Sequence, residues 1–187
     1  MFIFALYATV PPERAGITAV SLAAVLIGID IVRLFVPGIN RTLSWLFRPF
    51  MRANESHKPA GLSYMLAGVT TIILVLPRNV VFLTLLFLAV ADPLASYFGI
   101  RYGRDKLIGN KSLQGSLAAF VACFILALGY FCFMDLMRER LFIVGLLAAL
   151  IGALGELIPI GKLDDNLVFP IFSGVLLTGL FYVFGGL

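Results

Sequence analysis

The stretch from Gly109 to Ser116, GNKSLQGS, combines glycine, lysine and serine just before an apolar run. Backbone N–H groups at a helix N-terminus, together with a lysine, can hold a phosphate group. The stretch is not a P-loop, which requires Gly, four residues and then Gly-Lys-Ser/Thr, because Asn110 separates Gly109 from Lys111. Taken alone, it predicts a phosphate site and a basic turn with Ser112 as a helix cap equally well.

Three carboxylates lie within apolar runs: Asp30, Asp92 and Glu156. Ionisable residues inside membrane spans are costly and are functional hypotheses by default. Asp92 directly precedes a proline, and we predict a functional role for it. For Asp30 and Glu156 we favour structural pairing with arginines, since Arg33 follows Asp30 at helical i+3 spacing. A further polar cluster, Asp164–Asn166, could be a cap for the last helix or part of a site.

The elements that must position these residues are membrane helices. The chain of 187 residues is 61% hydrophobic and 13% charged, whereas soluble domains average about 45–50% apolar and about 25% charged. The prediction is an all-α, polytopic membrane helix bundle, forming a single domain over residues 1–187. Its apolar runs suggest about six spanning helices: Ile17–Val36, Gly61–Pro77, Val80–Ile100, Leu113–Met134, Leu141–Ile160 and Leu167–Leu187.

Two further segments are expected to be helical without spanning the membrane. Met1–Val10 is too short to span, and we interpret it as the stub of another helix. Arginines recur at helical spacing within Arg41–Arg52, which predicts a short helix lying on the membrane surface.

Basic residues are unevenly divided between the two sides that six spans define. One side carries Arg33, Arg41, Arg48, Arg52, Lys58, Arg101, Arg104, Lys106, Lys111 and Lys162, and the other Arg14, Arg78, Arg138 and Arg140. The positive-inside rule makes the first side cytoplasmic. The three carboxylates lie in the cytoplasmic halves of their helices, and the other three helices begin at this face. Basic groups, helix N-termini and carboxylates together suit a nucleoside triphosphate carried with Mg²⁺.

The sequence resembles the integral-membrane lipid kinases related to dolichol kinase, phytol kinase and the CTP-dependent diacylglycerol kinase. Four blocks carry the similarity: Asp30–Arg33; Met51–Glu55 followed by Gly61–Tyr64; Ala91–Ser96 through Gly99 and Gly103 to Asn110–Ser116; and Glu156 with Asp164–Pro170. The family's usual Arg-Lys-x-x-His segment before the first span is missing from this sequence, so the roles of those residues are not transferred.

The resemblance implies transfer of the γ-phosphate of a nucleoside triphosphate, commonly CTP, with ATP as the other donor, to a membrane lipid hydroxyl. The acceptor would be diacylglycerol, phytol or a polyprenol. Catalytic roles are expected for Asp92, Asp165 and Lys111, and Asp92 and Asp165 would hold Mg²⁺ or accept the hydroxyl proton. The expected phosphate-binding residues are Arg52, Gly103, Arg104, Asn110, Lys111, Ser112, Gly115 and Ser116. The expected supporting residues are Asp30, Arg33, Glu55, Glu156 and Asn166.

Two alternatives remain at this point. A CTP:phosphatidate cytidylyltransferase would also handle CTP and lipid phosphate, but its Pro-Gly-His-Gly-Gly signature is missing, since the single histidine, His57, has no glycine pair beside it. A transporter or binder of an anionic solute would favour sites reached from both sides. The expected partners are a lipid and a nucleotide, with no nucleic acid. The expected location is a cell inner membrane or the endoplasmic reticulum, with the site facing the cytoplasm.

Overall fold

The computed structural model describes residues 2–46, 58–159, 161 and 163–186, and this part of the chain is almost entirely helical. Five of its helical segments are long and apolar enough to cross a membrane, and a sixth apolar helix, α4, is shorter. The helices are α1 (Phe2–Thr9), α2 (Pro12–Phe35), α3 (Pro37–Leu46), α4 (Gly61–Val75), α5 (Arg78–Leu86), α6 (Asp92–Tyr102), α7 (Leu113–Phe133), α8 (Leu141–Leu157) and α9 (Asp165–Phe184). The predicted all-α membrane bundle is confirmed.

Short signals in the sequence set several helix ends. Pro12 opens α2 at a position where its missing N–H costs no hydrogen bond. The side chain of Asp164 accepts a hydrogen bond from the backbone N–H of Asn166 and caps α9, which ends at Gly185 with a positive φ of 79°. Asp164 is therefore the helix cap that the sequence offered as one interpretation.

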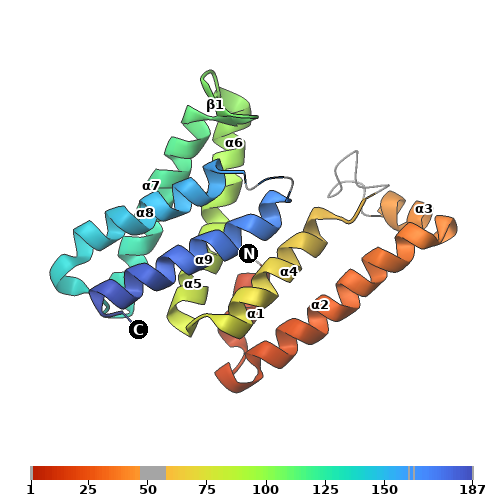
Figure 1. Cartoon of the computed structure of the whole chain (residues 1–187), viewed down its shortest axis with the longest axis horizontal. Coiled ribbons are helices and arrows are strands. Elements are labelled where there is room, and N and C mark those ends of the chain that lie inside the picture. The colour runs from red at the N-terminus through yellow and green to blue at the C-terminus, as the bar shows by residue number, and fades with distance from the viewer. Residues whose placement is uncertain (1, 47–57, 160, 162, 187) are drawn as a thin grey trace.

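The helices form a row in which α7, α8, α9, α4 and α2 lie side by side, with α6 packed on α7 (Figure 1). The largest fully buried side chains are phenylalanines from three elements, Phe87, Phe131 and Phe181. Small residues bring helices close together, as a Cβ at Gly152 of α8 would lie 2.4 Å from the sulfur of Cys123 of α7. Close approach at small residues is typical of membrane helix packing.

The third predicted span is one continuous helical segment, but it is not a regular α-helix throughout. It runs from α5 through a π-helical turn, Phe87–Ala91 (η2), into α6. The π turn comes directly before Asp92, and Pro93 lies in the first turn of α6, where a proline is tolerated. Single π turns inside helices are frequent at functional sites.

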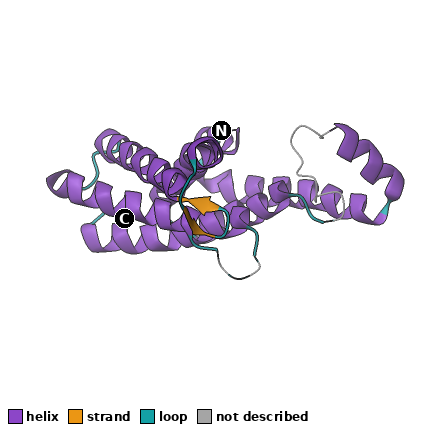
Figure 2. Ribbon diagram, turned by 90° about the horizontal axis from the view of Figure 1, so that it is seen from above, coloured by secondary structure: helices purple, strands orange, loops and turns teal. Residues whose placement is uncertain are grey.

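Two details differ from the sequence-based expectation. The helix placed at Arg41–Arg52 begins earlier, at Pro37, and residues 47–57 lie outside the described part of the chain. The polar segment before α7 is not only a turn, because it contains a two-stranded antiparallel sheet of β1 (Lys106–Ile108) and β2 (Lys111–Ser112), seen in Figure 2. The tight turn uses Gly109, whose φ of 56° suits glycine.

Candidate active site

The stretch Gly109–Ser116 runs from the turn of the β1–β2 hairpin into the N-terminus of α7. Ser112 is buried, and its hydroxyl accepts a hydrogen bond from the backbone N–H of Gly115 at 3.2 Å. Ser112 is thus the N-cap of α7, as one interpretation of the sequence expected. Asn110 is exposed in the turn, and its carbonyl oxygen accepts a hydrogen bond from Lys106 Nζ at 3.0 Å.

Three glycines let α6 approach the capped end of α7. A Cβ at Gly115 would lie 2.8 Å from the carbonyl oxygen of Ala95, and one at Gly103 would lie 2.6 Å from Ser112 Oγ. A Cβ at Gly99 would meet the same hydroxyl at 3.2 Å. The residues that resemble a phosphate cradle therefore also form a tight contact between two helices, which fixes the position of the hairpin.

Gln114 connects this contact to the loop before the hairpin. Its side-chain oxygen accepts hydrogen bonds from the backbone N–H groups of Arg104 at 3.1 Å and Asp105 at 3.4 Å, and its amide nitrogen donates to Asp105 Oδ2 at 2.9 Å. Arg104 itself is exposed. Reasoning from the sequence assigned no role to Gln114, because the hairpin that brings residues 104 and 114 together was not foreseen.

Lys111 lies at the centre of a charged cluster built from three elements. Its Nζ is 2.8 Å from Oε1 of Glu156, in the last turn of α8, and 3.3 Å from Oδ2 of Asp165, in the first turn of α9. The pairing of Glu156 with an arginine was wrong, since its partner is a lysine from a distant loop. Catalytic candidates Lys111 and Asp165 are thereby brought together.

Burial and charge act in opposite directions on Lys111. Burial lowers the pKa of its ammonium group, but the hydrogen bond and negative charge of Glu156, with the charge of Asp165, outweigh burial and leave that pKa above its ordinary value. Lys111 therefore remains positively charged at neutral pH. Its side chain is 27% exposed, so part of the group faces outward.

Among the buried polar atoms on α7 and α8 that have no hydrogen-bond partner among the described residues, two belong to predicted site residues. They are Oε2 of Glu156 and the hydroxyl oxygen of Ser116. Such atoms are costly in a protein interior and call for an explanation, for example an ion or a ligand. Both residues belong to the set proposed from the sequence.

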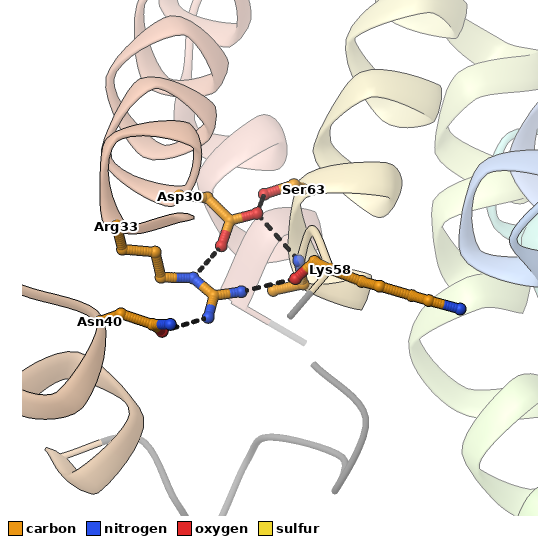
Figure 3. Close-up of polar contacts among 6 residues, drawn as sticks. Asp30, Arg33, Asn40, Lys58 and Ser63 are labelled. Atoms are coloured by element: carbon orange, nitrogen blue, oxygen red, sulfur yellow. Dashed lines mark hydrogen bonds and ion pairs between the residues drawn. The ribbon is translucent and has the colours of Figure 1, made fainter. Parts of the chain in front are cut away.

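Asp30 and Arg33 form a second polar cluster at the end of α2, shown in Figure 3. Arg33 Nε contacts Asp30 Oδ1 at 2.5 Å, which confirms the pairing expected from their spacing. Asp30 Oδ2 accepts hydrogen bonds from Ser63 Oγ at 2.6 Å and from the backbone N–H of Ala60 at 2.8 Å. Arg33 also donates to the carbonyl oxygen of Lys58 at 2.9 Å and to the side-chain oxygen of Asn40 at 3.2 Å.

This second cluster joins α2, α3 and the segment that leads into α4. The carboxylate and guanidinium groups have partners on several sides, which is how buried charges are normally stabilised. Its position supports the interpretation of Asp30 and Arg33 as structural, supporting residues.

The remaining predicted site residues are placed as follows. Asp92 is half-buried at the start of α6, and Asn166 is half-buried in the first turn of α9. Arg52 and Glu55 lie outside the described residues.

Three curated proteins that resemble this chain carry the same enzyme name. The chain is similar to CTP-dependent diacylglycerol kinase 1 of Schizosaccharomyces pombe, with 31% identity over 79% of this chain and 72% of that protein. It is also similar to the proteins of the same name from Saccharomyces cerevisiae, at 27% identity over 83% of this chain, and from Eremothecium gossypii, at 29% over 79%.

The alignments cover 60% and 52% of those last two relatives, so the chain spans little more than half of their length. No protein-family model matches the chain, and no solved structure matches it. The similarity to the S. pombe protein nonetheless extends over most of both sequences. The chain belongs to the family of CTP-dependent diacylglycerol kinases and is a membrane lipid kinase.

Proposed function

We propose that this chain transfers the γ-phosphate of CTP to the hydroxyl group of diacylglycerol. The observation that carries the proposal is the cluster in which Lys111 meets Glu156 and Asp165 beside the N-termini of α7 and α9. A lysine, two helix N-termini and carboxylates are the groups that a triphosphate and its counter-ion require. The relatives named as CTP-dependent diacylglycerol kinases support the choice of donor and acceptor.

Phosphate binding is assigned first to Lys111, as the group that would neutralise the negative charge of the triphosphate. Arg104 and Arg52 would add positive charge from the loops, and Gly103, Asn110, Ser112, Gly115 and Ser116 would shape the backbone around the phosphates. Ser112 and Gly115 would act mainly through the helix cap and the close contact with α6. Phosphoryl transfer depends chiefly on such positioning and charge neutralisation.

Asp92 and Asp165 share the two remaining tasks, which are to hold Mg²⁺ and to accept the proton of the lipid hydroxyl. In the reaction, the hydroxyl oxygen bonds to the γ-phosphorus, the bond from that phosphorus to the bridging oxygen breaks, and CDP leaves with the bridging oxygen. The residues present suit Mg²⁺, because it prefers oxygen ligands and commonly uses one or two carboxylates with phosphate oxygens. The buried Glu156 Oε2, which has no partner among the described residues, adds to this oxygen-rich environment. Glu55 and Asn166 are assigned as supporting polar groups.

The reaction would take place at the cytoplasmic leaflet. The positive-inside rule supports this orientation, because the loops next to the helix ends that carry Lys111, Glu156 and Asp165 belong to the more basic set. A lipid could then reach the site from within the membrane while the nucleotide enters from water.

The test uses the purified full chain in lipid micelles with Mg²⁺ and γ-labelled CTP or ATP. Diacylglycerol, phytol and a polyprenol are offered separately, and label in the lipid phase is counted. We expect label in diacylglycerol with CTP. Label in another lipid alone, or with ATP alone, would replace the proposed acceptor or donor. Pyrophosphate release from phosphatidate and CTP, without labelled lipid, would indicate a cytidylyltransferase instead.

A further inference from the structure

The carboxylate of Glu156 is buried, but only one of its two oxygens has a hydrogen-bond partner among the described residues. Its side chain is 5% exposed, and Oε1 accepts a hydrogen bond from Lys111 Nζ at 2.8 Å. Oε2 is buried and has no hydrogen-bond partner among the described residues. A buried, charged oxygen without a partner is unfavourable, and it points to a positively charged ligand at this position.

Asp165 brings a second carboxylate to the same place from a different helix. Its Oδ2 lies 3.3 Å from Lys111 Nζ, and its side chain is 56% exposed. Solvent therefore reaches the cluster at Asp165, whereas Glu156 is buried. Two carboxylates around one cation match the protein contribution to a typical Mg²⁺ site, in which phosphates and water supply the other oxygens. Among the described residues, no three His, Cys, Asp or Glu side chains are grouped so that they could hold a metal ion together, so a site here would use this pair.

Lys111 alone does not balance the negative charge of the two carboxylates. One ammonium between two carboxylates leaves a net negative charge, which repels a triphosphate. A divalent cation in place of the ammonium makes the carboxylate pair neutral. Lys111 would then be free to face the phosphates.

We propose that Glu156 and Asp165 form a divalent-cation site, and that the ammonium group of Lys111 fills this site in the absence of metal. When metal and nucleotide bind, Lys111 moves from the two carboxylates to the phosphates. This proposal rests on the proposed function for the identity of the nucleotide, but the cation site can be tested without it. It also divides the tasks left open above, because it assigns Asp165 to the cation and leaves Asp92 to accept the hydroxyl proton.

The test measures Mn²⁺ binding to the purified full chain in detergent by electron paramagnetic resonance, with neither nucleotide nor lipid present. Mn²⁺ is the probe because it shares the oxygen-ligand preference of Mg²⁺. We expect E156Q and D165N each to weaken Mn²⁺ binding by at least about 10-fold, since the loss of even an outer-shell partner of a metal ion has an effect of this size. K111M should instead tighten it, because the competing ammonium is removed. E139Q is the control, since Glu139 is an exposed glutamate in the turn that precedes α8, and this variant should bind Mn²⁺ like the wild type.

Unchanged Mn²⁺ binding in E156Q and D165N would overturn the cation site, and unchanged or weaker binding in K111M would overturn the exchange with lysine. If E156Q does not fold, as judged by size-exclusion chromatography, D165N carries the test because Asp165 is exposed. The outcome is separable from the proposed function. CTP-dependent lipid labelling with unaltered Mn²⁺ binding in the variants rejects only the cation site, whereas loss of Mn²⁺ binding in the variants of a chain that labels no lipid rejects only the kinase proposal.

Discussion

The ammonium nitrogen of Lys111 lies 2.8 Å from Oε1 of Glu156, although the two residues are 45 positions apart in the sequence. The contact joins a short hairpin to the end of α8, and Asp165 extends it to the start of α9. The α6–α7 and α8–α9 connections therefore meet at one charged cluster. Ionisable residues in membrane helices, such as Glu156 in α8, are functional candidates by default, and this cluster gives the proposals their most direct tests.

Replacement of Lys111 by methionine should reduce the kcat/KM for CTP by about 10²- to 10³-fold, since one positioned positive charge is lost from the transition state. Lys106, in the neighbouring strand, is the matched control because its side chain is exposed. Among the described residues, its Nζ donates a hydrogen bond to the carbonyl oxygen of Asn110 and contacts no carboxylate. Lys106→Met should keep near-wild-type kinetics. Equal losses in both variants would indicate a general charge effect of the hairpin rather than a role for Lys111.

Replacement of Asp92 by asparagine should abolish lipid phosphorylation while leaving expression and folding intact. The change removes the ability to accept a proton but keeps the size of the side chain at the start of α6. Labelled-lipid counting gives the activity, and size-exclusion chromatography reports the fold. A fully active Asp92→Asn enzyme would remove Asp92 from the mechanism.

Replacement of Gly115 by alanine should lower the thermal unfolding temperature in detergent. The new Cβ would lie 2.8 Å from the carbonyl oxygen of Ala95 and 3.2 Å from the Cα of Gly99, and both are backbone atoms that cannot move independently. Overpacking of this kind costs about 1–3 kcal/mol.

Gly129, in the same helix, provides the control for Gly115. A Cβ there would meet nothing within 4 Å. Gly129→Ala should therefore leave the unfolding temperature unchanged or raise it, because alanine favours a helix over glycine by up to about 1 kcal/mol. If Gly115→Ala is equally harmless, α6 and α7 are not packed as closely as the structure shows.

Replacement of Asp30 by asparagine should destabilise the protein by about 3–5 kcal/mol, because Arg33 would be left buried with an uncompensated charge. Asp135 and Arg138 form a matched pair with the same i,i+3 spacing and the same 2.5 Å distance, but both side chains are exposed. Asp135→Asn should therefore cost less than about 1 kcal/mol. Similar shifts of the unfolding temperature in the two variants would contradict the assigned difference in burial.

Much of the fold follows from the sequence alone. The apolar runs predict the helices because backbone groups in lipid must be paired within their own segment, and five long helices with the shorter α4 match those runs. Local spacing was equally informative where both partners lie on one helix or at its start, as for Asp30 with Arg33 and for Asp164 capping α9.

Other features depended on contacts between distant segments. Hydrophobic periodicity does not show which side chains of different segments meet. The pairing of Glu156 with Lys111, and the hydrogen bond from the backbone N–H of Arg104 to the side chain of Gln114, therefore appeared only in three dimensions. The π turn before Asp92 was likewise invisible, since its apolar sequence also fits a regular α-helix.

The sequence by itself determined the membrane bundle, the basic face and the chemical types available there, because burial in lipid and charge asymmetry act through composition and short-range spacing. Only the tertiary structure decided that Lys111 lies in contact with both Glu156 and Asp165. It also decided that Gly99, Gly103 and Gly115 allow the close contact between α6 and the start of α7. The physical reason is that helix packing depends on the fit of whole surfaces, which many sequences of the same hydrophobic pattern would satisfy differently.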